Sequence, residues 1–150
     1  MGRNSLRIYL DTNILLDVLS PMERPCSKAS RIIFQAIRSG YMEAVLSTQS
    51  ILDAAYILSK ATDYSPVQFS RQILLILSFI NIRSIDSANI RDALSSPSGD
   101  LEENAQFALA DNEGCDLLVT SDRSFRRDRA TTDLPIFTPE ELVARMTGSV

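Results

Sequence analysis

Short apolar runs alternate along this chain with longer stretches in which apolar residues recur every three or four positions. The runs are typical of buried strands and lie at Leu6–Leu10, Met42–Leu46, Ile80–Arg83, Asp116–Thr120 and Ile136–Phe137. The stretches between them predict helices over residues 14–19, 27–38, 48–58, 66–79, 87–94 and 101–112, and one more after residue 138. Strands that alternate with helices indicate an α/β sandwich with a mostly parallel sheet, and the 150 residues predict a single domain over 1–150.

Capping residues support these boundaries. Ser65, Asp86, Asp100 and Thr138 each stand where a helix is expected to begin. Pro66 and Pro139 follow two of them at the first helical position, where proline is tolerated.

Composition removes several classes of chemistry. The chain has no His, which excludes mechanisms that need an imidazole base and zinc sites with histidine ligands. Cys26 and Cys115 stand far apart, so we expect two buried thiols in a reducing compartment. A net charge of -4 argues against a protein that coats nucleic acid, though not against an enzyme whose acids surround metal ions. The longest apolar stretch, Ile73–Ile80, is too short to cross a membrane, and no signal peptide opens the chain; we expect a cytoplasmic protein.

Two acidic residues follow predicted strands directly. Asp11 ends the first strand and Asp122 follows the strand at 116–120. In parallel sheets, ligands gather at the carboxyl ends of strands, so both are candidate site residues. For Asp11, capping of the next helix is an equal alternative. Asp17, six residues on, is expected to be solvated.

Two further acids lie inside predicted helices. Asp53 interrupts an otherwise apolar run, and a buried carboxylate normally has a cation beside it; the alternative is an exposed stripe paired with Lys60. Glu103 heads a stripe that faces the core, with Asp100 one turn earlier. Acids there also favour a helix N-terminus, which is the better interpretation for the adjacent Glu102.

The four acids Asp11, Asp53, Glu103 and Asp122 can therefore converge on one acidic pocket. Like charges that close repel unless divalent cations neutralise them. Oxygen ligands without His or Cys select Mg²⁺ or Mn²⁺, and such pockets perform phosphoryl transfer.

At this point the motifs resemble a known family. Leu10–Asp17, the lone acid Asp53, Asp100–Gln106 and Val119–Phe125 are similar, in order and spacing, to the four motif blocks of the PIN-domain family. The resemblance covers residues 6–125 and implies a three-layer α/β/α sandwich and a metal-dependent ribonuclease that hydrolyses RNA. Many bacterial and archaeal relatives are VapC-like toxins held inactive by an antitoxin.

Carried over by position, the resemblance makes Asp11, Asp53, Glu103 and Asp122 the catalytic and metal-binding acids. The family usually has Glu at the second position and Asp at the third. This chain has the shorter Asp53 at the second position and the longer Glu103 at the third. The departure keeps open a catalytically weakened module that binds RNA or protein. Polar residues beside the acids are expected to orient them by hydrogen bonds: Asn13, Asp100, Thr120 and Ser121.

Other families with a strand-end aspartate fit less well. A haloacid-dehalogenase-like phosphatase needs a second acid where this chain has Asn13, and both it and a receiver domain need a later lysine, whereas none follows Lys60.

Two patterns indicate partners. A basic cluster beside Asp122 is suited to RNA phosphates, with a solvated loop as the alternative; it consists of Arg123, Arg126, Arg127 and Arg129. The predicted helix over 67–79 is apolar on nearly every face, which predicts a homodimer or partner surface unless the helix is deeply buried.

Overall fold

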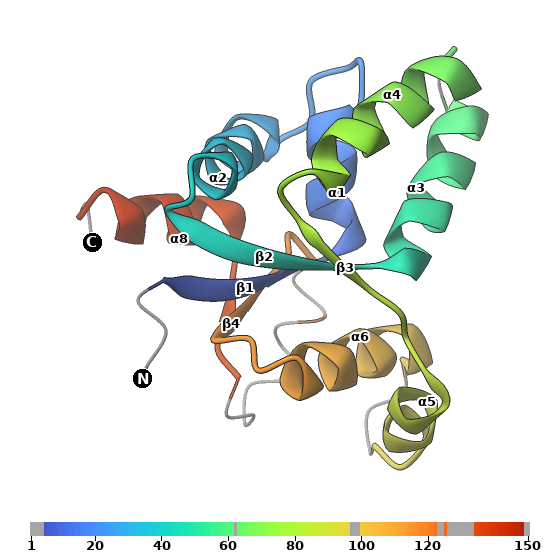
Figure 1. Ribbon diagram of the computed structural model, residues 1–150, viewed down its shortest axis with the longest axis vertical. Coiled ribbons are helices and arrows are strands. Elements are labelled where there is room, and N and C mark those ends of the chain that lie inside the picture. Colours follow the sequence, from blue (N-terminus) through green and yellow to red (C-terminus); the bar gives the residue numbers. More distant parts are fainter. Residues whose placement is uncertain (1–4, 62, 97–99, 123–124, 126–133, 149–150) are drawn as a thin grey trace.

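Five parallel strands form the centre of the protein, shown in Figure 1 as a computed structural model. The structure describes residues 5–61, 63–96, 100–122, 125 and 134–148. The strands are β1 (Leu6–Leu10), β2 (Met42–Ser47), β3 (Asn81–Arg83), β4 (Leu117–Val119) and β5 (Ile136–Phe137). Their order in the sheet is β3-β2-β1-β4-β5, and every neighbouring pair is parallel. The expected parallel sheet is confirmed.

Seven helices lie in the described part of the chain. They are α1 (Thr12–Leu19), α2 (Ser27–Arg38), α3 (Thr48–Ala61), α4 (Pro66–Leu77), α5 (Ser87–Leu94), α6 (Leu101–Asn112) and α8 (Pro139–Met146). Ser65, Asp86, Asp100 and Thr138 are the N-cap residues of α4, α5, α6 and α8, as the sequence predicts. None of these helices is long and apolar enough to span a membrane.

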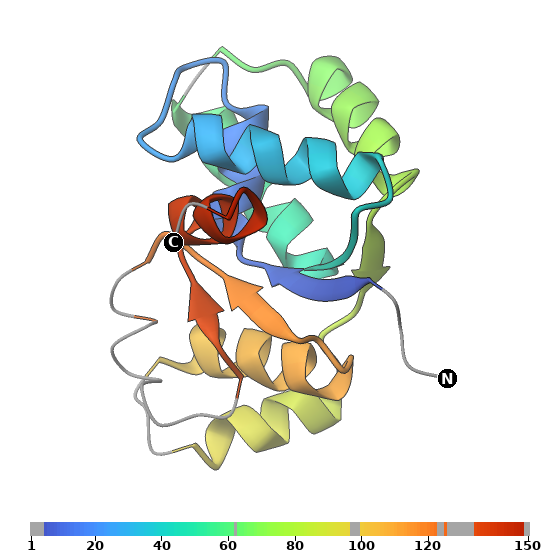
Figure 2. The ribbon, with the colours of Figure 1, turned by 90° about the vertical axis from the view of Figure 1, so that its left-hand side faces the viewer.

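The helices cover the two faces of the sheet unequally. Helices α1, α2, α3, α4 and α8 lie on one face, and α5 and α6 lie on the other (Figures 1 and 2). Side chains alternate accordingly along β1: Ile8 and Leu10 join the larger apolar cluster, and Tyr9 points into the smaller one. The three-layer α/β/α sandwich is therefore confirmed.

The strand order places a switch point between β1 and β4. From β1 the chain proceeds outward through β2 to β3, then returns along α5 and α6 to β4 on the other side of β1. Connections leave the two central strands toward opposite faces, so a crevice opens at their carboxyl ends. Asp11 directly follows β1, and Asp122 lies three residues after the end of β4.

Three expectations about burial are corrected or settled. Asp17 is 2% exposed rather than solvated. Cys26 and Cys115 are both free but only half-buried. Helix α4 buries Ile73 and Ile76 and packs Phe69 partly against the core, while Val67, Leu74, Leu75 and Leu77 stay exposed. Deep burial of the whole helix is thus excluded, and the exposed apolar surface is confirmed.

Candidate active site

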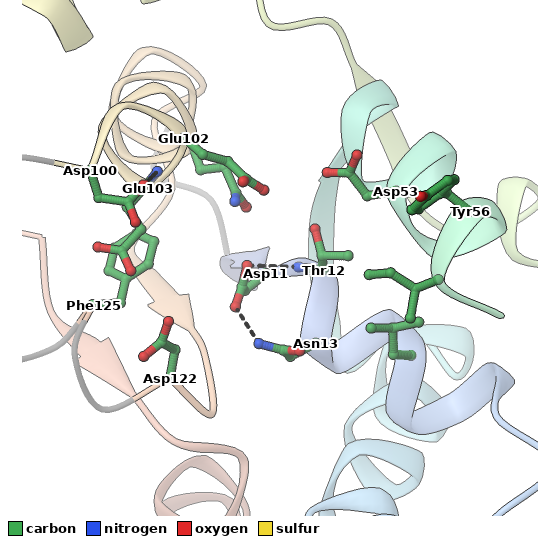
Figure 3. Close-up of a pocket in the computed structure, with 13 residues that line it drawn as sticks. Asp11, Thr12, Asn13, Asp53, Tyr56, Asp100, Glu102, Glu103, Asp122 and Phe125 are labelled. Atoms are coloured by element: carbon green, nitrogen blue, oxygen red, sulfur yellow. Dashed lines mark hydrogen bonds between the residues drawn. The ribbon is translucent and has the colours of Figure 1, made fainter. Parts of the chain in front are cut away.

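A cavity of about 310 Å³ opens at the switch point between β1 and β4 (Figure 3). Six of the side chains that line it are acidic: Asp11, Asp53, Asp100, Glu102, Glu103 and Asp122. No Lys or Arg is among the described residues that line it. The fold thus gathers all four acids of the sequence motifs, with two more beside them, around one space.

Asp11 is the most constrained of these acids. It is 6% exposed and serves as N-cap of α1, with Thr12 N–H donating to Oδ1 at 2.8 Å. Its Oδ2 accepts the Thr120 hydroxyl at 2.8 Å and the Asn13 amide at 3.4 Å. Asp11 therefore caps a helix and at the same time lines the cavity.

Burial and hydrogen bonding shift the pKa of Asp11 in opposite directions. Burial raises the pKa of its carboxyl, and the nearby charge of Asp122 raises it further. Hydrogen bonds from Thr120, Thr12 and Gln106 lower that pKa, because they stabilise the carboxylate. A cation bound nearby would act in the same direction as these hydrogen bonds.

Asp53 comes from α3, and its environment differs from the expected one. Leu52 and Tyr56 beside it are about two-thirds exposed, at 64% and 66%, so the apolar run around Asp53 is largely on the surface. The carboxylate is half-buried and accepts a 2.8 Å hydrogen bond from Gln49 Nε2. No ion pair joins Asp53 to Lys60 among the described residues, and Lys60 Nζ instead lies over the Tyr56 ring, 5.7 Å from its centre.

Helix α6 supplies three acids at its first turn. Asp100 is the N-cap and accepts a 3.0 Å hydrogen bond from the N–H of Glu103. Glu103 is buried, 7% exposed, and lines the cavity. The sequence predicts this burial, because Glu103 shares one face of the helix with Phe107 and Ala110.

Glu102 is the acid that the sequence did not single out. Its side chain points into the space between α6 and α3 (Figure 3). Burial raises the pKa of this carboxyl, and the charges of Asp53, Asp100 and Asp11 raise it further. The sequence has adjacent acids at 102 and 103, but a favourable interaction with the helix N-terminus was the better interpretation for Glu102.

Thr120 and Ser121, the polar residues before Asp122, take different positions. Thr120 bridges the strand ends: its hydroxyl donates to Asp11 and accepts a 3.0 Å hydrogen bond from the N–H of Asp122. Ser121 lines a neighbouring cavity instead, with Asp17 and Arg24. Arg123, Arg126, Arg127 and Arg129 lie outside the described residues.

The buried side-chain amide of Gln106 also faces the acids. Gln106 is 4% exposed, and its Oε1 accepts a 3.3 Å hydrogen bond from the hydroxyl of Tyr9. This contact leaves the amide N–H₂ of Gln106 for Asp11, where it stabilises the charged form. No local pattern in the sequence selects Gln106, because its partner Tyr9 lies 97 residues away from it.

The donor chemistry fits a hard divalent cation, because every charged group among the described residues of the cavity wall is a carboxylate. Within the described ranges, however, no three of these side chains are already arranged to hold an ion. Mutual repulsion keeps uncompensated carboxylates apart. Binding an ion would therefore require the side chains to move inward.

Comparisons with known proteins agree with this architecture. The family model described as "PIN domain" matches residues 7–124. Ribonuclease VapC1 of Aquifex aeolicus is 26% identical over 147 residues, which cover 95% of this chain and 96% of that protein.

Two solved structures share the fold at low identity. A toxin-antitoxin complex from Klebsiella pneumoniae aligns with a TM-score of 0.62 and 19% identity, covering 88% of this chain and 97% of that one. The Mycobacterium tuberculosis toxin VapC20, which cleaves the sarcin-ricin loop, aligns with a TM-score of 0.62 and 10% identity, covering 80% and 93%.

Proposed function

This chain belongs to the PIN-domain family, and from that premise we propose that it is a metal-dependent endoribonuclease. The observation that carries the proposal is the cavity at the β1–β4 switch point, walled by six carboxylates. The chain has no histidine to act as a general base. The similarity to Ribonuclease VapC1, which extends over nearly the whole of both chains, supports RNA as the substrate.

We assign the metal to Asp11, Asp53, Glu103 and Asp122, with Mg²⁺ or Mn²⁺ as the ion. Such an ion, when bound, activates water and neutralises charge on the phosphate and the leaving oxygen. Asp100 contributes by holding the first turn of α6, and hence Glu103, in place. Glu102 adds negative charge at the rim, which strengthens the attraction for a cation.

The chain's own polar residues hold the acids ready. Thr120 fixes the strand ends that carry Asp11 and Asp122, and Asn13 is a further donor to Asp11. Ser121 lines the neighbouring cavity and is not one of these donors. A carboxylate that is already oriented loses less freedom when it binds an ion.

RNA must approach an acidic cavity, so cationic and stacking groups have to hold it. We propose Arg123, Arg126 and Arg127 as phosphate contacts, and replacing the last two with Ala should weaken RNA binding and flatten its salt dependence. In the described part, Tyr56 lines the cavity with a largely exposed ring, and Lys60 lies beside that ring. This pair is suited to stacking an unpaired base and contacting its phosphate, so we propose single-stranded RNA as the substrate.

We also propose two protein partners. Similarity to a toxin-antitoxin complex supports an antitoxin that inhibits this chain. The exposed Leu74, Leu75 and Leu77 of α4 support a homodimer through that helix, because a group of large apolar side chains exposed to water favours association. Light scattering of the purified chain should give the mass of a dimer, and Leu74→Glu should give a monomer; a monomeric mass for the native chain would exclude this dimer.

A second candidate is a weakened module that binds RNA without turnover. It is favoured by the exchanged lengths of Asp53 and Glu103 and by the absence of a preformed ion-binding group within the described residues. One assay separates the two functions. Structured and unstructured RNA are incubated with Mg²⁺, Mn²⁺ or EDTA, and Asp11→Asn serves as the control. Cleavage that requires metal and Asp11 supports the nuclease, whereas binding without cleavage in every condition supports the module.

A further inference from the structure

Arg24 lies outside the acidic cavity but is joined to it by side-chain hydrogen bonds. Its Nε donates to Asp17 Oδ1 at 2.8 Å, and its Nη2 donates to Asn13 Oδ1 at 3.4 Å. Asn13 in turn donates from Nδ2 to Asp11 Oδ2 at 3.4 Å (Figure 3). A continuous path therefore runs from a residue in the loop after α1 to the most constrained acid of the site.

Asp17 anchors this path. Its carboxylate is 2% exposed, and its second oxygen accepts the Ser30 hydroxyl at 2.7 Å. Both oxygens are thus in use, one by the loop and one by α2. Asn13 and Asp17 stand four residues apart on α1, on the same face of that helix, so one guanidinium reaches both.

The backbone of the loop is fixed as well. The N–H of Arg24 donates to the Ser27 hydroxyl at 2.9 Å, and that hydroxyl donates to the carbonyl of Asp17 at 3.1 Å. Arg24 is therefore held at its backbone by Ser27 of α2 and at its guanidinium by two residues of α1. Its side chain is about one-third exposed, so these hydrogen bonds, rather than tight packing, determine its position.

The chemistry of the guanidinium determines the orientation of Asn13. Arginine only donates hydrogen bonds, so the oxygen of the Asn13 amide must face Arg24. The amide nitrogen then faces Asp11 and can only donate to it. An ionised Asp11 only accepts hydrogen bonds, so it selects the same orientation of the Asn13 amide as Arg24 does. A side chain at position 24 that can also accept hydrogen bonds would no longer reinforce that orientation.

We propose that Arg24 is a positioning residue of the active site, which acts through Asn13 to orient Asp11 for metal binding. The proposal rests on the proposed metal-dependent function. Asp17 is the anchor that holds Arg24 in place, and neither residue touches the substrate.

Arg24→Gln tests the orientation, since glutamine both donates and accepts. Isothermal titration of the full chain with Mn²⁺ should show a Kd raised about tenfold, at the lower end of the effect of such supporting residues. The sign is informative, because loss of a nearby positive charge alone would tighten cation binding. Arg83→Gln is the matched control: it removes an arginine paired with Glu113 and should leave the Kd unchanged.

Two combined variants separate positioning from stability. Arg24→Gln leaves Asp17 buried without its cation and should lower the melting temperature, which Asp17→Asn in the same chain should restore. The Mn²⁺ Kd of this double variant should stay raised. In an Asn13→Ala chain, Arg24→Gln should add no further loss, because the relay is already removed.

Steady-state cleavage of single-stranded RNA gives an independent readout. Arg24→Gln should lower kcat while KM changes less than about twofold, the pattern of a lost transition-state interaction. A raised KM with unchanged kcat would make Arg24 an RNA contact and overturn the proposal. So would recovery of the Mn²⁺ Kd together with the melting temperature, or additive losses with Asn13→Ala. If the native chain binds no Mn²⁺ and cleaves no RNA, the proposed function itself fails.

Discussion

The hydroxyl of Thr120 donates a 2.8 Å hydrogen bond to Asp11 Oδ2 across 109 residues of sequence. It therefore joins the carboxyl end of β4 to that of β1, where the cavity opens. The hydroxyl oxygen of Thr120 also accepts a hydrogen bond from the N–H of Asp122. One hydroxyl thus fixes two of the acids relative to each other, which gives the first prediction.

Thr120→Val keeps the shape of this side chain and removes the hydroxyl. Asp11 then loses a donor while still buried, which costs about 1–3 kcal/mol of the free energy of unfolding. Mn²⁺ affinity should fall about tenfold or more. Urea denaturation in EDTA and titration with Mn²⁺ measure the two effects. Thr120→Ser retains the hydroxyl and should behave like the native chain; equal losses in the two variants would assign the effect to packing.

Asp11→Asn should abolish RNA cleavage and leave the metal-free protein about as stable as before. The charge repulsion with Asp122 disappears, and the Thr120 hydroxyl can rotate to accept from the new amide. The native chain should gain about 2.7 kcal/mol when free Mn²⁺ exceeds its Kd by about a hundredfold, and the variant should gain much less. Melting curves with Mn²⁺ and with EDTA decide this. Equal metal-induced shifts would remove Asp11 from the ligands.

The stability of the metal-free protein should fall as the pH rises from the ordinary pKa values of two carboxyl groups toward their raised values in the folded state. In the folded state the pKa values of Asp11 and Glu102 are raised above 3.8 and 4.5, chiefly by burial. Between these ordinary values and the raised ones, the unfolded chain has released protons that the folded chain still holds. Unfolding therefore becomes easier with increasing pH.

Urea denaturation in EDTA across that interval measures this slope. Asp11→Asn combined with Glu102→Gln should flatten it, and saturating Mn²⁺ should reverse it, since a bound cation favours the ionised folded state. A slope that survives the double substitution would have to come from other groups.

Tyr56→Ala should weaken binding of unpaired RNA by about 1–3 kcal/mol, the range for loss of a stacking aromatic ring. Tyr56→Phe keeps the ring and should bind as the native chain does. Fluorescence anisotropy with a short single-stranded RNA, in the Asp11→Asn chain to prevent cleavage, measures the affinity. If the two variants bind alike, the ring does not stack a base.

Cys26 should react slowly with iodoacetamide near neutral pH. Burial first, and then the adjacent carboxylate of Glu140, raise the pKa of its thiol to about 11. Only the thiolate reacts, so in a Cys115→Ser chain the alkylation rate should rise about tenfold per pH unit up to that value. Glu140→Gln should accelerate the reaction at neutral pH. A rate that levels off below about pH 9 would contradict the raised pKa.

The sequence by itself determined the elements and the order of the acids. Each strand is a short apolar run, and each of four helices begins at a Ser, Thr or Asp cap whose bond is local, as at Asp86 and Thr138. Asp11 and Asp122 could be selected because parallel strands end at one edge of a sheet. These inferences depend only on neighbours within a few residues along the chain.

Only the tertiary structure decided which side chains face the cavity. Asp17 and Glu102 resemble solvated acids in the sequence, yet one is buried against Arg24 and the other lines the cavity. Conversely, the apolar run around Asp53 predicts burial, and Leu52 is exposed. Periodicity fixes the faces of a helix relative to one another but not its rotation against the sheet. That rotation is set by packing between segments far apart in sequence, as is the bond that joins Thr120 to Asp11.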